Sequence, residues 1–173
     1  MADAEAAGPR THERQGRTLV VGLGSPILRD DAIGLHVVRA LADRLPGESF
    51  SFVEAGAAGF RLLPLIEGWP RVVFVDALVS PPQTGQSPSP GRLHRLDLGD
   101  LQAALTLSSS HEPSLGDTLA LGRQLGMNLP EKVLVLGIEV SDPFTFDEQM
   151  TPRLARRVET LADEIARECL AWC

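Results

Sequence analysis

The chain has few cysteines and no long apolar run. Cys169 and Cys173 lie four positions apart near the C-terminus, and two thiols make neither a disulfide framework nor a complete metal site. No stretch of about 18 apolar residues is present to cross a bilayer. The first residues, MADAEAAGPRTHERQGR, lack the apolar core of a signal peptide. We therefore expect a reducing, cytoplasmic location without membrane attachment.

Basic residues are also few. The 16 Lys and Arg residues are outnumbered by 23 Asp and Glu residues, which gives a formal charge of -7. Such a chain repels nucleic acid phosphates, so we expect no nucleic acid partner. A hydrophobic content of 43% in 173 residues is sufficient for the core of one domain. Residues 1–16 are polar and without periodicity, which predicts a disordered tail before a single domain over 17–173.

Short apolar runs alternate with amphipathic stretches along this domain. The pattern predicts buried strands over 17–24, 49–56, 71–79 and 132–140, an edge strand over 92–98, and helices over 33–46, 59–66, 114–126 and 151–172. Thr151 is the expected N-cap of the last helix, with Pro152 at its first position. The alternation predicts an α/β fold, a single doubly wound, mostly parallel sheet of about five strands with helices on both faces. In such folds the functional crevice lies at the carboxyl ends of the strands.

Three consecutive predicted strands carry carboxylates at these ends. The motifs are GSPILRDD, EAGAAG and DALVS. Asp76 follows the apolar run VVFV, where an ionised group placed one residue earlier would be buried at a cost of several kcal/mol. A structural role is the alternative to a functional one for each of these residues. In that alternative, Asp30 or Asp31 only caps the first helix, and Asp76 is only a turn residue at a strand end.

A histidine lies in the serine-rich stretch SSSHEPSLGD, just before a helix that Ser114 can cap. Of the four histidines, His111 is the one placed to face the crevice, because the others fall in the tail, on the first helix and on the edge strand. Its structural alternative is an exposed loop histidine. Two carboxylates and one imidazole from separate segments form a three-ligand set for a borderline divalent ion, with coordination positions left open.

Other chemistries fit the sequence less well. Gly22 and Gly24 have the spacing of a dinucleotide fingerprint, but Ile27 stands where its third glycine is required. Acidic side chains at the helix entry also oppose pyrophosphate binding. No GxSxG motif is present and neither cysteine follows a predicted strand, so a nucleophilic serine or cysteine is disfavoured.

Five motifs, taken in order, resemble the nickel-iron hydrogenase maturation endopeptidases. They are GLGSPILRDDAIGLHVVRAL, EAGAAGFRLL, VVFVDALVS, SHEPSLGDTL and KVLVLGIEV followed by MTP, and they cover roughly residues 18–170. The resemblance implies a doubly wound α/β sheet. It also implies an endopeptidase that removes a short C-terminal extension from the precursor of a hydrogenase large subunit after nickel insertion.

The resemblance further implies which residues form the site. The acid at the second position of the DD pair, the aspartate ending the third strand and the loop histidine contact the metal and act in catalysis, and here they are Asp31, Asp76 and His111. The nickel is supplied by the substrate, and no organic cofactor is expected. Two alternatives are a related peptidase acting on another protein and a non-catalytic module that binds a metal or a nucleotide.

Two motifs depart from the family pattern. The family usually has Asn after the second glycine, where this chain has Ser25 and Pro26, so the hydrogen bonds that orient Asp31 are in question. The second-strand motif is often Asp-Gly-Gly-Thr, where this chain has Glu54-Ala55-Gly56-Ala57. An acidic or hydroxyl role at that turn is therefore in question too.

Overall fold

The centre of the molecule is a five-stranded sheet with the strand order β2-β1-β3-β5-β4. The structure is a computed structural model and describes residue 14 and residues 16–56, 59–79, 89–96 and 114–173. The strands are β1 (Thr18–Leu23), β2 (Phe50–Ala55), β3 (Arg71–Leu78), β4 (Leu93–Leu96) and β5 (Lys132–Glu139). Neighbouring strands pair in parallel except β4, which is antiparallel to β5 at the sheet edge. The predicted mostly parallel sheet and its edge strand are confirmed.

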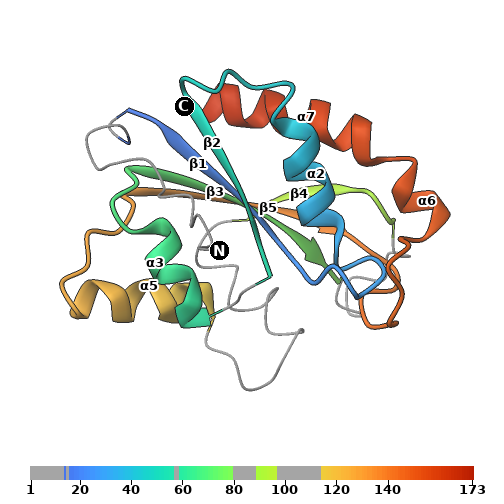
Figure 1. Ribbon diagram of the computed structural model, residues 1–173, viewed down its shortest axis with the longest axis horizontal. Helices are drawn as coiled ribbons and strands as arrows, with labels where there is room; N and C mark the ends of the chain where they lie inside the picture. Colours follow the sequence, from blue (N-terminus) through green and yellow to red (C-terminus); the bar gives the residue numbers. More distant parts are fainter. Residues whose placement is uncertain (1–13, 15, 57–58, 80–88, 97–113) are drawn as a thin grey trace, which may run out of the picture.

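Helices cover both faces of this sheet. They are α2 (Ile33–Leu41), the 3-10 turn η1 (Gly59–Leu62), α3 (Leu63–Ile66), α5 (Leu115–Gln124), α6 (Pro152–Ala155) and α7 (Val158–Trp172). Figure 1 shows α2 and α7 above the sheet and α3 and α5 below it. The predicted doubly wound α/β architecture is therefore confirmed.

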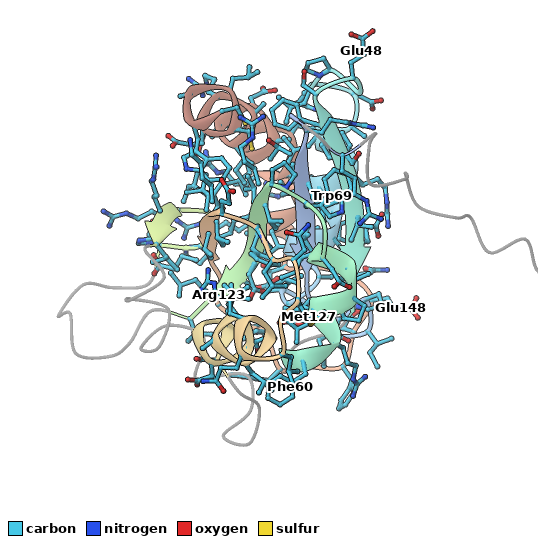
Figure 2. The ribbon with its side chains drawn as sticks, turned by 90° about the vertical axis from the view of Figure 1, so that its left-hand side faces the viewer. Glu48, Phe60, Trp69, Arg123, Met127 and Glu148 are labelled. Carbon is cyan, nitrogen blue, oxygen red and sulfur yellow. The ribbon has the colours of Figure 1, made fainter. Side chains whose placement is uncertain are left out.

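The alternation of side chains along β3 divides the core between the two faces. Val73 and Val75 pack in the cluster that contains α2 and α7, whereas Val72 and Phe74 pack in the cluster that contains α3 and α5. All four side chains are fully buried, and Figure 2 shows side chains filling the space on both faces. Burial on both faces explains why the strand reads as a continuous apolar run. By the same alternation, Asp76 lies on the α3 and α5 face.

Glycines bring α2 into direct contact with the sheet. A Cβ atom on Gly34 would overlap the carbonyl oxygens of Leu23 and Val75, and one on Gly22 would overlap the carbonyl oxygen of Gly34. The backbone of α2 therefore lies directly on β1 and β3, near the carboxyl ends of both strands. This packing brings the residues just before α2 close to the end of β3.

The end of the first helix was predicted wrongly. The first helix ends at Leu41, not at Pro46, because the backbone N–H groups of Arg44 and Leu45 both donate to the carbonyl of Leu41 and close a turn there. Leu45 nevertheless stays buried, which explains why the apolar spacing continues past the end of the helix.

The predicted single C-terminal helix is divided into α6 and α7. At the break, the N–H of Arg157 donates to Leu154, three residues back, and its guanidinium donates to the carbonyl of Gly91. Pro152 begins α6 as predicted, but Thr151 makes no side-chain cap. Its hydroxyl donates to Asp30 instead.

The predicted disordered tail lies almost entirely outside the described residues. Arg14, which is described, lies over the Trp69 ring, with its guanidinium carbon 5.2 Å from the ring centroid, and it donates to the carbonyl of Glu67. In the part of the chain that the structure describes, no helix has both the length and the apolar character needed to cross a membrane.

Candidate active site

The turn between β1 and α2 depends on Gly24. This residue has a φ of +137°, and a Cβ atom there would overlap the carbonyl oxygen of Asp31, so no L side chain fits. The turn folds back so that the backbone N–H of Ser25 donates to Oδ2 of Asp31 at 2.6 Å. Because the donor is a backbone group, the replacement of the family's Asn by Ser25 leaves this orienting bond available.

Asp76 lies at the carboxyl end of β3, half-buried, and Oδ1 accepts a hydrogen bond from the N–H of Ala77 at 2.8 Å. Burial raises the pKa of Asp76 to about 7, and the negative charge of Asp31 contributes to the rise. Burial also raises the pKa of Asp31, against the opposing effect of the Ser25 N–H. The structure therefore places Asp31 near enough to Asp76 for its charge to act on that carboxyl group.

These two carboxylates have no basic partner among the described residues. Each salt bridge found there joins other groups. Two neighbouring carboxylates in a partly buried place repel each other, and a cation between them relieves the repulsion. The arrangement suits a positively charged ligand and opposes an anionic one.

His111, the third predicted ligand, lies outside the described residues. The helix that follows its loop is described, and Ser114 caps it by accepting a hydrogen bond from the N–H of Asp117 at 3.1 Å. This helix, α5, packs on the same face as Asp76. Within the residues that the structure describes, no cluster of three or more His, Cys, Asp or Glu side chains is arranged to hold a metal ion.

The idea that Asp30 or Asp31 caps α2 is wrong. The N-cap of α2 is Ala32, and no side chain caps the helix. Asp30 is completely buried and accepts hydrogen bonds from the loop after β5. Its donors are the N–H and hydroxyl of Thr151, the N–H of Asp142 and the hydroxyl of Ser141. Asp30 thus ties this loop to the turn that carries Asp31.

Glu139 is a buried carboxylate that the sequence interpretation missed. It ends β5, is 4% exposed, and lies with Oε2 3.2 Å from Nε2 of His94. Its Oε1 accepts a hydrogen bond from the N–H of Ser89. An acidic residue at the end of the apolar run KVLVLGIEV was the available signal. These contacts give Glu139 a structural role in holding residues 89–94 against β5.

The other described titratable groups do not join the carboxylate pair. The electrostatic neighbours of His36 are Arg39 and Glu54, and burial lowers its pKa. Glu54, the acid of the unusual second motif, pairs with Arg39 at 2.6 Å. Burial raises the pKa of the Cys169 thiol to about 12, which removes it as a thiolate nucleophile.

A mostly parallel sheet with two neighbouring carboxylates near its carboxyl edge defines an α/β protein with a site that attracts cations. Comparison with protein families is more specific, because the family described as hydrogenase maturation protease, HycI, matches residues 35–168. The match extends over most of the chain, so the chain belongs to the hydrogenase maturation protease family. It is an endopeptidase, and it processes the C-terminus of a hydrogenase large subunit.

Individual relatives agree with this assignment. The chain is 28% identical over 152 residues to the hydrogenase 2 maturation protease of Escherichia coli K12, covering 86% of this chain and 88% of that protein. It is 24% identical over 160 residues to the hydrogenase expression/formation protein HupD of Rhodobacter capsulatus, covering 90% of this chain and 72% of that protein.

Solved structures have the same fold. The hydrogenase maturating endopeptidase HybD of E. coli superposes with a TM-score of 0.66 at 27% identity, covering 86% of this chain and 89% of HybD. The HycI protease of Thermococcus kodakarensis has a TM-score of 0.63 at 21% identity, covering 91% of this chain and 96% of that one. At that identity, the second comparison supports the fold alone.

Proposed function

We propose that the chain removes a C-terminal extension from the precursor of a nickel-iron hydrogenase large subunit after nickel insertion. In this proposal the nickel held by the precursor is the recognition element, and Asp31, Asp76 and His111 bind it. One observation carries the proposal. Asp76 has its pKa raised to about 7 beside Asp31, and neither carboxylate pairs with a basic group of the described residues.

Two neighbouring carboxylates without a counter-charge repel each other, and binding of a divalent cation removes this repulsion. Because the protein supplies a partial ligand set, open positions are left for groups of the precursor. A precursor without nickel offers no cation to this pair, so it binds weakly and is not cut. The charge of the site therefore makes nickel loading a condition for cleavage.

Cleavage requires a polarised carbonyl and an activated water. A divalent ion supplies both functions when it lies beside the scissile bond. A carboxylate oxygen beside the ion accepts the proton of that water, and Asp31 and Asp76 are the two carboxylates that the site offers for this step. The Ser25 N–H holds Asp31 in one orientation, so the direction of its charge is fixed before the substrate arrives.

We also propose that this reaction takes place in the cytoplasm. Both cysteines are free thiols, Cys169 buried and Cys173 exposed. Free thiols are typical of proteins that work in a reducing compartment.

The proposal is tested with purified protein and two forms of one precursor, loaded with nickel and free of it. Mass spectrometry should show shortening of the loaded form only. The variants Asp31→Asn and Asp76→Asn should each lower the cleavage rate by about 100-fold or more. Asp43→Asn is the matched control, because Asp43 is exposed, and it should cut normally. Equal cleavage of both precursor forms, or full activity in both site variants, would refute the proposal.

A further inference from the structure

Hydrogen bonds hold Asp30, the residue before Asp31, through its side chain and its backbone. Oδ1 accepts from the N–H of Thr151 at 2.8 Å. Oδ2 accepts from the N–H of Asp142 at 3.1 Å, the hydroxyl of Thr151 at 3.1 Å and the hydroxyl of Ser141 at 3.3 Å. The backbone N–H of Asp30 donates to the carbonyl of Asp142 at 3.1 Å, and its carbonyl accepts from the N–H of Ile33 at 3.2 Å. Asp30 is therefore fixed in place.

The carboxylate of Asp31 is held less firmly than that of Asp30. Among the described residues it accepts one hydrogen bond, from the N–H of Ser25 at 2.6 Å. Its charge acts on Asp76, and two ionised carboxylates repel each other while no cation lies between them. One hydrogen bond restrains a side chain only weakly against this repulsion. The position of Asp31 therefore depends on how firmly its own backbone is held, and Asp30 is the neighbour that holds it.

The Thr151 hydroxyl bonds Asp30 although Thr151 stands where a helix cap is expected. Threonine is among the residues that cap helices, and Thr151 precedes α6, yet its side chain makes no cap there. The hydroxyl donates to a residue 121 positions away in the sequence. Figure 1 shows the loop after β5 beside the turn after β1. The loop that ends at Thr151 thus holds the turn that carries Asp31.

We propose that Thr151 and Ser141 are positioning residues for cleavage, because their hydroxyls, acting through Asp30, hold Asp31 where it shares a cation with Asp76. The inference rests on the proposed function, since it takes Asp31 and Asp76 as the cation-binding pair. A ligand that is already in position loses less conformational freedom when the cation binds. Removal of a group that orients a metal ligand lowers metal affinity by about 10-fold or more.

The first test measures cation affinity in Thr151→Val. This variant removes the hydroxyl, keeps the backbone N–H that donates to Asp30, and leaves every charge in place. A change in affinity therefore reports the position of Asp31 and not its charge. Titration calorimetry with cadmium, well below the melting temperature, should show a Kd raised by about 10-fold. Thr151→Ser keeps the hydroxyl and should restore the affinity. Thr160→Val is the matched control, because Thr160 is exposed on α7.

The second test follows the orientation of Asp31 directly. The Ser25 N–H donates to Oδ2 of Asp31, so its hydrogen exchange reports whether that carboxylate stays in place. Exchange at Ser25 should be faster in Thr151→Val, while the amides of β3 stay protected. If the hydroxyl only stabilises the loop, exchange changes within residues 141–151 and not at Ser25.

Cleavage of the nickel-loaded precursor provides the third readout. Thr151→Val should lower kcat/KM by about 10-fold, and Thr151→Ser should cut at nearly the normal rate. Ser141→Ala keeps the test open if Thr151→Val does not fold, because Ser141 is exposed and its bond to Asp30 is the longest of the four. Its effects on cadmium Kd and on kcat/KM should have the same direction and be smaller, about 2-fold to 3-fold.

The outcomes separate this inference from the proposed function. Weaker cadmium binding and faster Ser25 exchange in Thr151→Val, without any cleavage by the unaltered protein, would support positioning and refute the function. Unchanged cadmium affinity and unchanged Ser25 exchange in folded Thr151→Val and Ser141→Ala proteins, with normal cleavage, would overturn positioning and leave the function standing. An unaltered protein that binds no cadmium would also overturn positioning, because no shared cation would then exist.

Discussion

Asp30 and Asp31 are adjacent and chemically identical, yet the structure gives them different roles. Asp30 is completely buried and takes its hydrogen bonds from residues 141–151. Asp31 is partly exposed and takes one bond from the Ser25 N–H. Adjacent side chains in a turn point in different directions, so one anchors the loop beneath the site and the other faces Asp76. Each can therefore be changed to test one role.

The raised pKa of Asp76 predicts a pH-dependent loss of stability. Its pKa in the folded protein is about 7, above its ordinary value of 3.8, so the folded state holds this proton more tightly than the unfolded state. The contribution is full below about pH 4 and is lost as the pH rises towards 7. Relative to Asp76→Asn, the unaltered protein should lose roughly 2–4 kcal/mol of unfolding free energy over this range.

Urea unfolding at several pH values measures this difference. In Asp31→Asn the loss should be smaller, because the charge that helps to raise the pKa of Asp76 is gone. If the unfolding free energies of the unaltered protein and Asp76→Asn change with pH in parallel, Asp76 has its ordinary pKa and the prediction is wrong.

At the scale of elements, contact between α2 and the sheet positions Asp31. Gly34→Ala would improve helix propensity by about 1 kcal/mol, but its Cβ would overlap the backbone of β1 and β3. Backbone cannot move aside as a flexible side chain can, so the clash should dominate and lower the unfolding free energy by about 3 kcal/mol or more. Gly47→Ala, where a Cβ meets nothing within 4 Å, is the control and should be neutral. A stabilised Gly34→Ala protein would contradict the close packing.

The loop after β5 depends on one carboxylate from another element. Asp30→Ala leaves the partly buried N–H groups of Asp142 and Thr151 without their acceptor, at a cost of about 1 kcal/mol for each group. Hydrogen exchange should accelerate at these two amides while β3 and β5 stay protected. The exposed Asp43→Ala should leave the exchange pattern unchanged, and unchanged protection in Asp30→Ala would remove the anchoring role.

At the scale of the whole molecule, the sequence predicted the sheet better than the helix ends. The central strands are buried on both faces, and this burial appears in the sequence as continuous apolar runs such as VVFV. The break at Arg157 has no Gly or Pro to signal it, because it is closed by a contact with Gly91. Thr151 has the chemistry of a cap, but Asp30, remote in the sequence, takes its hydroxyl.

The candidate site likewise has features that the sequence predicts and features that it does not. Carboxylates after β1 and on β3 could be expected to lie close together, because the carboxyl ends of parallel strands share one edge of the sheet, whereas the choice of Asp31 over Asp30 came from the family resemblance. The anchoring by Asp30 and the contact between Glu139 and His94 could not, since both pair residues from distant segments whose approach only the folded chain reveals.

The most direct test of a cation site shared by Asp31 and Asp76 is anomalous diffraction from crystals soaked with cadmium, a divalent ion that stands in for nickel. We predict a peak within bonding distance of carboxylate oxygens of both Asp31 and Asp76, with none at the adjacent Asp30. The peak should disappear in Asp76→Asn crystals. Cadmium bound only elsewhere on the protein, with the two carboxylates empty at saturating metal, would contradict the shared cation site.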